Sequence, residues 1–232
     1  MSSGMKKITD LLFRPFGMEL RPRAMPTRSL DEGLRILSRS VKPKTVIDVG
    51  VASGTPALYA HFPPAAFAYL LVEADPHYAS VVDALSRSLP AKAEHVACGV
   101  ESGYAALHTF SDHRKSSLAL PVRQLVSAGD VTVPVETLDR MAERNGLSGP
   151  YLLKIDVEGA EMEALAGATR VLSETCAAVI ETSVSPRFAG GADFSDIVCF
   201  MKDRGFRVSD IVGGTLDARG SLHQADVVFM RI

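Results

Sequence analysis

The feature that most constrains the fold is an alternation, from residue 44 onwards, of short apolar runs with stretches of helical periodicity. Apolar runs of about four to eight residues are typical of buried strands, and strands that alternate with helices pair in parallel between two helical layers. The expected strands are residues 45–49, 68–72, 94–97, 103–110, 131–136, 151–155, 177–181, 206–212 and 225–231. The expected helices are residues 55–61, 76–88, 138–145, 160–172 and 194–204. This order predicts a doubly wound α/β fold, mostly parallel with an antiparallel last strand, and a polar loop over 111–130.

The segment ahead of this alternation has a different character. Residues 1–28 read as a short helix followed by a connector rich in proline and arginine, and residues 29–40 read as an amphipathic helix. The sequence therefore predicts an N-terminal helical arm and connector over 1–43 and a main domain over 44–232. The basic side chains of the arm suit either a solvated segment or a contact with an anionic surface or an acidic partner.

The composition excludes several classes of protein. The 232 residues carry a formal net charge of −2, so no basic field is available to hold nucleic acid. The three cysteines are widely spaced and odd in number, which argues against a disulfide framework or a zinc site and favours a cytoplasmic location. We expect no membrane span, because no apolar stretch reaches about 18 residues. We also expect no signal peptide, because Asp10, Arg14 and Pro15 interrupt any apolar region near the start of the sequence. Nothing in the sequence specifies an oligomeric state.

A glycine turn follows the first expected strand, in the run Asp48-Val49-Gly50-Val51-Ala52-Ser53-Gly54. Its two glycines let the backbone approach a ligand closely, and the free N–H groups of the next helix can face a carboxylate. The spacing differs from the Gly-x-Gly-x-x-Gly of dinucleotide sites, and the Lys-Ser/Thr of a phosphate-binding loop is missing. Asp48 suits a cationic group such as an amino acid's ammonium. We expect Asp48, Gly50, Ser53 and Gly54 to bind a cofactor.

The next two strand ends extend this site. Glu73 follows the second strand about 20 positions after the glycine turn, where a carboxylate grips the hydroxyls of a ribose. Ala97 and Cys98 end the third strand, and small side chains there let an adenine lie flat. A ligand with an amino-acid end and a ribose end is implied, and S-adenosylmethionine has both.

Carboxylates gather after the strand over 151–155, in the run Lys154-Ile155-Asp156-Val157-Glu158-Gly159-Ala160-Glu161. The edge formed by the carboxyl ends of the strands is where such sheets bind ligands, which favours a functional role for Asp156 and Glu158. Glu161 has a structural alternative, since an acid in the first turn stabilises a helix. Asp156, Glu158 and Glu181 together suit either proton transfer or a divalent cation that orients a sugar diol, and we expect no metal.

These elements, in this order, resemble the FkbM-type methyltransferase family over roughly residues 44–185. The resemblance rests on the stretches Val46–Gly50 with Gly54, Val72-Glu73 with Asp75-Pro76, Val96–Gly99 with Gly103, Ser116–Leu118, Thr137–Asp139, Lys154–Glu161 and Glu181. It implies a Rossmann-like methyltransferase sheet and cofactor roles for Asp48, Gly50, Gly54, Glu73 and Asp156. Family members resemble S-adenosylmethionine-dependent O-methyltransferases that act on sugars, polyketides or other secondary metabolites, often on bacterial surface or secreted glycans. A small-molecule or glycan acceptor is therefore expected.

The sequence contains several candidates for the residue that removes the proton from the acceptor's hydroxyl. We expect Glu158 first, with Asp156 and Glu181 as further catalytic candidates and His113 and His223 as alternatives in loops. Two other functions stay open: a nucleotide- or NAD-binding oxidoreductase, which the glycine spacing disfavours, and a non-catalytic cofactor-binding partner subunit.

Overall fold

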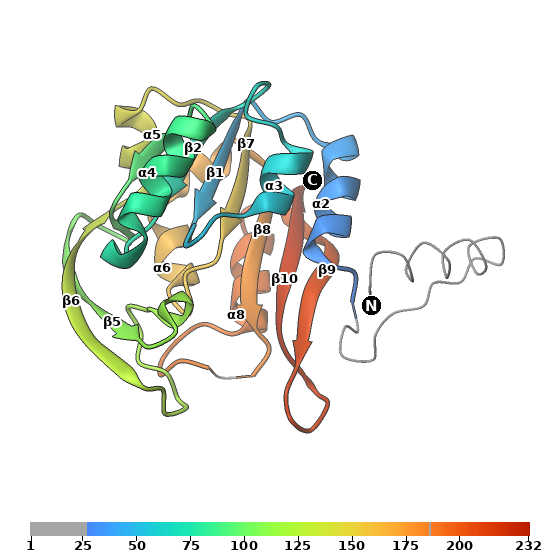
Figure 1. Cartoon of the computed structure of the whole chain (residues 1–232). Coiled ribbons are helices and arrows are strands. Elements are labelled where there is room, and N and C mark those ends of the chain that lie inside the picture. Colours follow the sequence, from blue (N-terminus) through green and yellow to red (C-terminus); the bar gives the residue numbers. More distant parts are fainter. Residues whose placement is uncertain (1–26, 186) are drawn as a thin grey trace, which may run out of the picture.

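A seven-stranded sheet forms the centre of the protein in a computed structural model that describes residues 27–185 and 187–232 (Figure 1). The short N-terminal helix expected within residues 1–28 lies almost wholly outside the described residues. The strand order is β3-β2-β1-β7-β8-β10-β9. These strands are β1 (Thr45–Val49), β2 (Ala68–Val72), β3 (Lys92–Glu94), β7 (Tyr151–Ile155), β8 (Thr175–Ser183), β9 (Phe206–Leu216) and β10 (Leu222–Arg231).

The directions of the strands confirm the predicted doubly wound sheet. β1 pairs in parallel with β2 and β7, β2 with β3, and β7 with β8. The last strand, β10, is antiparallel to both of its neighbours, β8 and β9. The chain order reverses across β1, so the carboxyl ends of β1, β2 and β7 meet at the point where such folds bind ligands.

Helices cover both faces of the sheet. They are α2 (Leu30–Ser40), α3 (Pro56–His61), α4 (Ala79–Ser88), α5 (Leu138–Arg144), α6 (Glu161–Ala166), α7 (Thr169–Ser173) and α8 (Phe194–Lys202). In β1, Val46 packs into the core beneath α2, α3 and α4, and Ile47 packs into the core beneath α5 to α8. Burial on both faces explains why the central strands are apolar at almost every position.

A second sheet corrects the prediction of one strand over 94–97. That segment is divided between β3, at the edge of the main sheet, and β4 (Ala97–Cys98), which pairs with β6 (Ser127–Glu136). β6 pairs with β5 (Gly103–Phe110) in a long curved ribbon beside the main sheet (Figure 1). The loop expected over 111–130 is shorter than predicted, because β6 begins at Ser127.

The helix expected over 160–172 is two helices, α6 and α7, which meet near Gly167. A Cβ on Gly167 would lie 2.0 Å from the carbonyl oxygen of Gly99, so the two segments approach closely there. The carboxylate of Asp139 accepts hydrogen bonds from the N–H groups of Arg170 and Val171, both at 2.8 Å, and thus caps α7. This cap gives the Thr137-Leu138-Asp139 run a structural role.

The N-terminal helix α2 begins with a capping box between Ser29 and Glu32. Leu34 and Leu37 of α2 lie in the core that also holds Val46, and the division of the chain after residue 43 stays a prediction. In the described ranges, no helix has the length and apolar character needed to cross a membrane.

Candidate active site

A cavity of about 410 Å³ opens at the carboxyl ends of β1, β2 and β7. This volume lies in the range of about 300–1,000 Å³ that is usual for small-molecule sites. The cavity brings together most of the predicted site residues: its lining includes Gly50, Ser53, Gly54, Glu73, Ala97, Cys98, Asp156, Glu158 and Glu181. Asp48 lies behind this lining and is fully buried.

The backbone of the glycine turn packs closely against the backbone at the end of β7. Gly50 has a φ of +78°, and a Cβ at this position would lie 1.7 Å from the carbonyl oxygen of Asp156. The N–H of Asp156 donates to the carbonyl of Val49 at 3.0 Å, so β1 and β7 stay joined beyond their ends. Only glycine fits here, both for its backbone conformation and for the space available.

Glu73, which follows β2, connects the end of this strand to the glycine turn through hydrogen bonds. One of its carboxylate oxygens accepts from the N–H of Ala52 at 2.6 Å, and the other accepts from the N–H of Asp75 at 2.8 Å. Burial raises the pKa of Glu73, although these backbone donors offset part of the effect. Each carboxylate oxygen has two acceptor sites, so Glu73 can still accept from a ligand in the cavity.

Lys154 is a buried cation at the base of the cavity. Its Nζ lies 3.2 Å from Oδ2 of Asp156 and 3.8 Å from Oδ1 of Asp48. Tyr59 donates to the other oxygen of Asp48 at 2.8 Å, while Oδ1 accepts no hydrogen bond within the described part of the chain. Burial alone would lower the pKa of Lys154, but the carboxylates of Asp156 and Asp48 outweigh it and raise this pKa.

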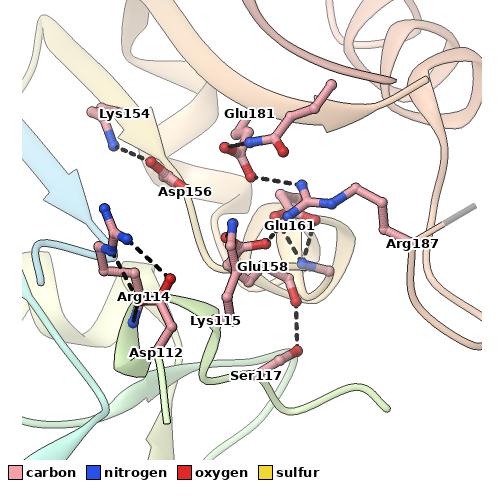
Figure 2. A network of polar contacts seen from close by, with 12 residues as sticks. Asp112, Arg114, Lys115, Ser117, Lys154, Asp156, Glu158, Glu161, Glu181 and Arg187 are labelled. Atoms are coloured by element: carbon pink, nitrogen blue, oxygen red, sulfur yellow. Dashed lines mark hydrogen bonds and ion pairs between the residues drawn. The ribbon is translucent and has the colours of Figure 1, made fainter. Parts of the chain in front are cut away.

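An arginine lies between two of the predicted carboxylates (Figure 2). Arg187 donates to Glu158 and, at 3.1 Å, to Glu181. The second oxygen of Glu158 accepts from Lys115 at 2.6 Å, and the second oxygen of Glu181 accepts from Gln224. All four oxygens are therefore engaged, and burial raises the pKa of Glu181 well above its usual range.

A divalent cation bound by Asp156, Glu158 and Glu181 was one expectation for this cluster. The guanidinium of Arg187 instead supplies the positive charge between Glu158 and Glu181. Across residues 27–185 and 187–232, no group of three or more His, Cys, Asp or Glu side chains is arranged to hold a metal ion. Glu161 lies beside this network, and both of its oxygens accept from the N–H of Gly159, at 3.0 and 3.1 Å.

A short segment crosses from the β2 side of the cavity to the β7 side. On the β2 side, the carboxylate of Asp75 accepts from His113 at 2.8 Å and from Ser116 at 2.7 Å. On the β7 side, Ser117 donates to the backbone carbonyl of Glu158 at 2.5 Å, beside the ion pair of Lys115. Residues 113–117, which we call the strap, thus link the two strand ends over the site.

Sequence reasoning missed Arg187 and Lys115, and it did not connect His113 or Ser116 with Asp75. Arg187 and Lys115 lie outside the strands and the longer helices, so no periodic pattern marks them. Their partners are 29 and 43 positions away along the chain. The Ser116-Ser117-Leu118 stretch was the available signal, since both serines bond to residues that follow strand ends.

Comparisons with known proteins agree with this architecture. The sequence model of the methyltransferase FkbM domain matches residues 48–208, more than half of the chain. Among curated proteins, none matches this sequence.

Three solved structures are similar to this chain at low sequence identity. The O-methyltransferase TomG of Streptomyces achromogenes, involved in tomaymycin synthesis and solved in complex with S-adenosylmethionine, is 11% identical with a TM-score of 0.50, over 100% of this chain and 91% of that chain. Magnesium protoporphyrin IX methyltransferase (ChlM) of Synechocystis PCC 6803 with bound S-adenosylmethionine is 11% identical with a TM-score of 0.46, over 100% and 92%. A putative O-methyltransferase of Klebsiella pneumoniae is 12% identical with a TM-score of 0.47, over 98% and 100%.

At 11% identity and a TM-score of 0.50, the TomG structure supports the fold alone. The family assignment comes from the domain match over residues 48–208. The chain belongs to the FkbM family of S-adenosylmethionine-dependent methyltransferases.

Proposed function

We propose that this chain methylates a hydroxyl group on a sugar, a glycan or a secondary metabolite in the cytoplasm. The observation that carries the proposal is a partly exposed carboxylate, Asp156, that lines the cavity beside the glycine turn. A hydroxyl acceptor must lose a proton as it is methylated, and a carboxylate within hydrogen-bond reach is a suitable base.

The described residues fit the cofactor at three places. The Gly50 turn lines the cavity with backbone, which suits the amino-acid end, and Glu73 keeps acceptor sites for the ribose hydroxyls. Ala97 and Cys98 belong to an apolar part of the lining that suits adenine. We infer that these residues, with Ser53 and Gly54, hold S-adenosylmethionine, while Asp48 acts from behind the lining through Lys154 and Tyr59.

Bound there, S-adenosylmethionine supplies an electrophilic methyl group on a sulfonium. The protein must align the acceptor oxygen with that group and take up the hydroxyl proton. Asp156 suits the second task because Lys154 contacts only its Oδ2, and 34% of its side chain is exposed. Glu158 and Glu181 suit it less, because Lys115, Arg187 and Gln224 engage their oxygens.

Methyl transfer from labelled S-adenosylmethionine to a panel of sugars, oligosaccharides and phenolic metabolites tests the proposal. We expect transfer to at least one hydroxyl acceptor. Asp156→Asn should lower kcat by about 10²- to 10⁴-fold, the usual contribution of a general base, with a smaller loss of cofactor affinity. The exposed Glu101→Gln is the matched control and should leave kcat unchanged.

Two outcomes would contradict the proposal in different ways. If Asp156→Asn keeps its activity and Glu158→Gln loses it, the base is Glu158. If the protein binds S-adenosylhomocysteine but methylates no acceptor of the panel, the result favours a non-catalytic cofactor-binding subunit.

A further inference from the structure

The apolar end of the cavity has a polar group at its margin that the roles above leave unused. Ala97 and Leu107 of the smaller sheet pack there with Ala74 and Leu118, and all four residues line the cavity. Next to Ala74, Asp75 binds the imidazole of His113, which also lines the cavity. An imidazole therefore lies beside the surface that suits adenine.

Two contacts fix the orientation of this imidazole. Nδ1 of His113 lies 2.8 Å from Oδ2 of Asp75, a carboxylate that is only 4% exposed. The ring of His77 stacks on the ring of His113 with centroids 3.9 Å apart and planes 8° from parallel. Because a hydrogen bond and a stacked ring act together, the His113 ring is held in one plane.

The Asp75 contact also decides which ring nitrogen carries the proton. Burial alone would raise the pKa of Asp75, but hydrogen bonds from Ser116 and His113 outweigh it and keep this pKa below its usual value. The ionised carboxylate can only accept, so Nδ1 of His113 is the donor, and whenever the ring carries a single proton Nε2 is an acceptor. Within the described ranges, Nε2 has no hydrogen-bond partner.

We propose that Nε2 of His113 accepts a hydrogen bond from the exocyclic amino group of the adenine, so that the Asp75–His113 pair selects an aminopurine cofactor. This proposal rests on the proposed function, since it requires S-adenosylmethionine in the cavity. A 6-oxo purine presents an acceptor where adenine presents a donor, and two acceptors cannot bond to each other. The buried carboxylate of Asp75 prevents the ring from presenting a donor at Nε2 without taking up a second proton.

The Asp75–His113 pair is better placed to bind adenine than to remove the acceptor's proton. Asp75 follows β2, and its backbone N–H donates to Glu73, the residue that suits the ribose. The candidate base, Asp156, follows β7 and contacts Lys154. His113 therefore belongs to the nucleoside side of the cavity, and its role is cofactor selection.

Titration calorimetry at pH 8 with S-adenosylhomocysteine and its 6-oxo analogue, S-inosylhomocysteine, tests the proposal. The wild-type protein should bind the adenine compound about tenfold more tightly, the value of one lost hydrogen bond with an unpaired acceptor left behind. His113→Ala should weaken binding of the adenine compound by about five- to tenfold and leave binding of the analogue unchanged, which removes the discrimination. His113→Gln keeps an acceptor, an amide oxygen, near the position of Nε2. This variant should therefore restore part of the preference for the adenine compound.

The matched control is His95→Ala. His95 is another histidine that contacts an aspartate, Asp83 at 2.8 Å, but it does not line the cavity. This variant should bind both compounds like the wild type, and circular dichroism should show that all variants fold. Equal affinity of the wild type for both compounds, or an equal loss for both in His113→Ala, would overturn the proposal. If neither compound binds the wild type, the proposed function fails as well.

Discussion

Lys154 is the residue whose charge most directly supports the arrangement of the site. Its side chain is 3% exposed, and its ammonium faces the carboxylates of Asp48 and Asp156, which would otherwise be like charges at two adjacent strand ends. Removing one partner of a buried ion pair leaves an uncompensated charge and costs about 3–5 kcal/mol. Figure 2 shows this ion pair opposite the cluster of Glu158, Glu181 and Arg187.

We therefore predict that Lys154→Met lowers the free energy of unfolding by about 3–5 kcal/mol, measured by urea denaturation. Lys42→Met is the control, because Lys42 is exposed, and its effect should stay within about 0.5 kcal/mol. A loss below about 1 kcal/mol for Lys154→Met would mean that the two aspartates do not depend on this cation.

At the scale of elements, the contact between the glycine turn and β7 sets the shape of the cavity. We predict that Gly50→Ala is severely destabilised, since its Cβ would lie 1.7 Å from the backbone of Asp156. Gly146→Ala is the matched control: Gly146 also has a positive φ, +65°, but a Cβ there meets nothing within 4 Å. Thermal unfolding should show a loss of about 1–2 kcal/mol for Gly146→Ala and a clearly larger one for Gly50→Ala. Equal losses would show that backbone strain alone requires glycine at position 50.

The elements that could be predicted well from the sequence are those with a strong local pattern of apolar residues. The boundaries of β1, β2 and β7 were predicted to the residue, because each strand is buried on both faces and ends at a turn or an acidic residue. The split between β3 and β4 was missed, since a chain that leaves one sheet for another keeps its apolar character. The break between α6 and α7 was missed because the Asp139 cap comes from a distant segment.

The strength of the local sequence pattern also decides which residues of the site could be predicted. Strand ends place Glu73, Asp156 and Glu181 at one edge, so their meeting around one cavity follows from topology. Arg187 and the strap lie in irregular segments, and only the folded chain brings them to Glu158. Asp48 carries a carboxylate at the expected position, yet it faces Lys154 and Tyr59 behind the cavity lining.

At the scale of the whole molecule, buried carboxyl groups make stability depend on pH. Burial raises the pKa of Glu161 to about 7 and the pKa of Asp226 to about 6. Between the unfolded and the folded pKa, the native protein binds more protons than the unfolded chain, so the free energy of unfolding falls as pH rises. For Glu161 this fall occurs between its ordinary pKa of 4.5 and about pH 7.

We predict that Glu161→Gln removes this part of the pH dependence. The stability of the variant relative to the wild type should increase by about 2–3 kcal/mol between about pH 5 and about pH 8, measured by urea denaturation at each pH. Glu163→Gln, an exposed position in the same helix, should leave the difference constant. Parallel pH profiles for Glu161→Gln and the wild type would show that Glu161 does not release a proton in this range.

The central claim is that the cavity at the ends of β1, β2 and β7 holds S-adenosylmethionine, with Glu73 on the ribose. Titration of S-adenosylhomocysteine into the wild-type protein and into a folded Glu73→Gln variant tests it most directly. We predict one bound molecule per chain for the wild type, and an affinity about 10- to 100-fold lower for Glu73→Gln, because charge-assisted hydrogen bonds are lost. No heat of binding with the wild type, or equal affinities for the two proteins, would contradict the claim.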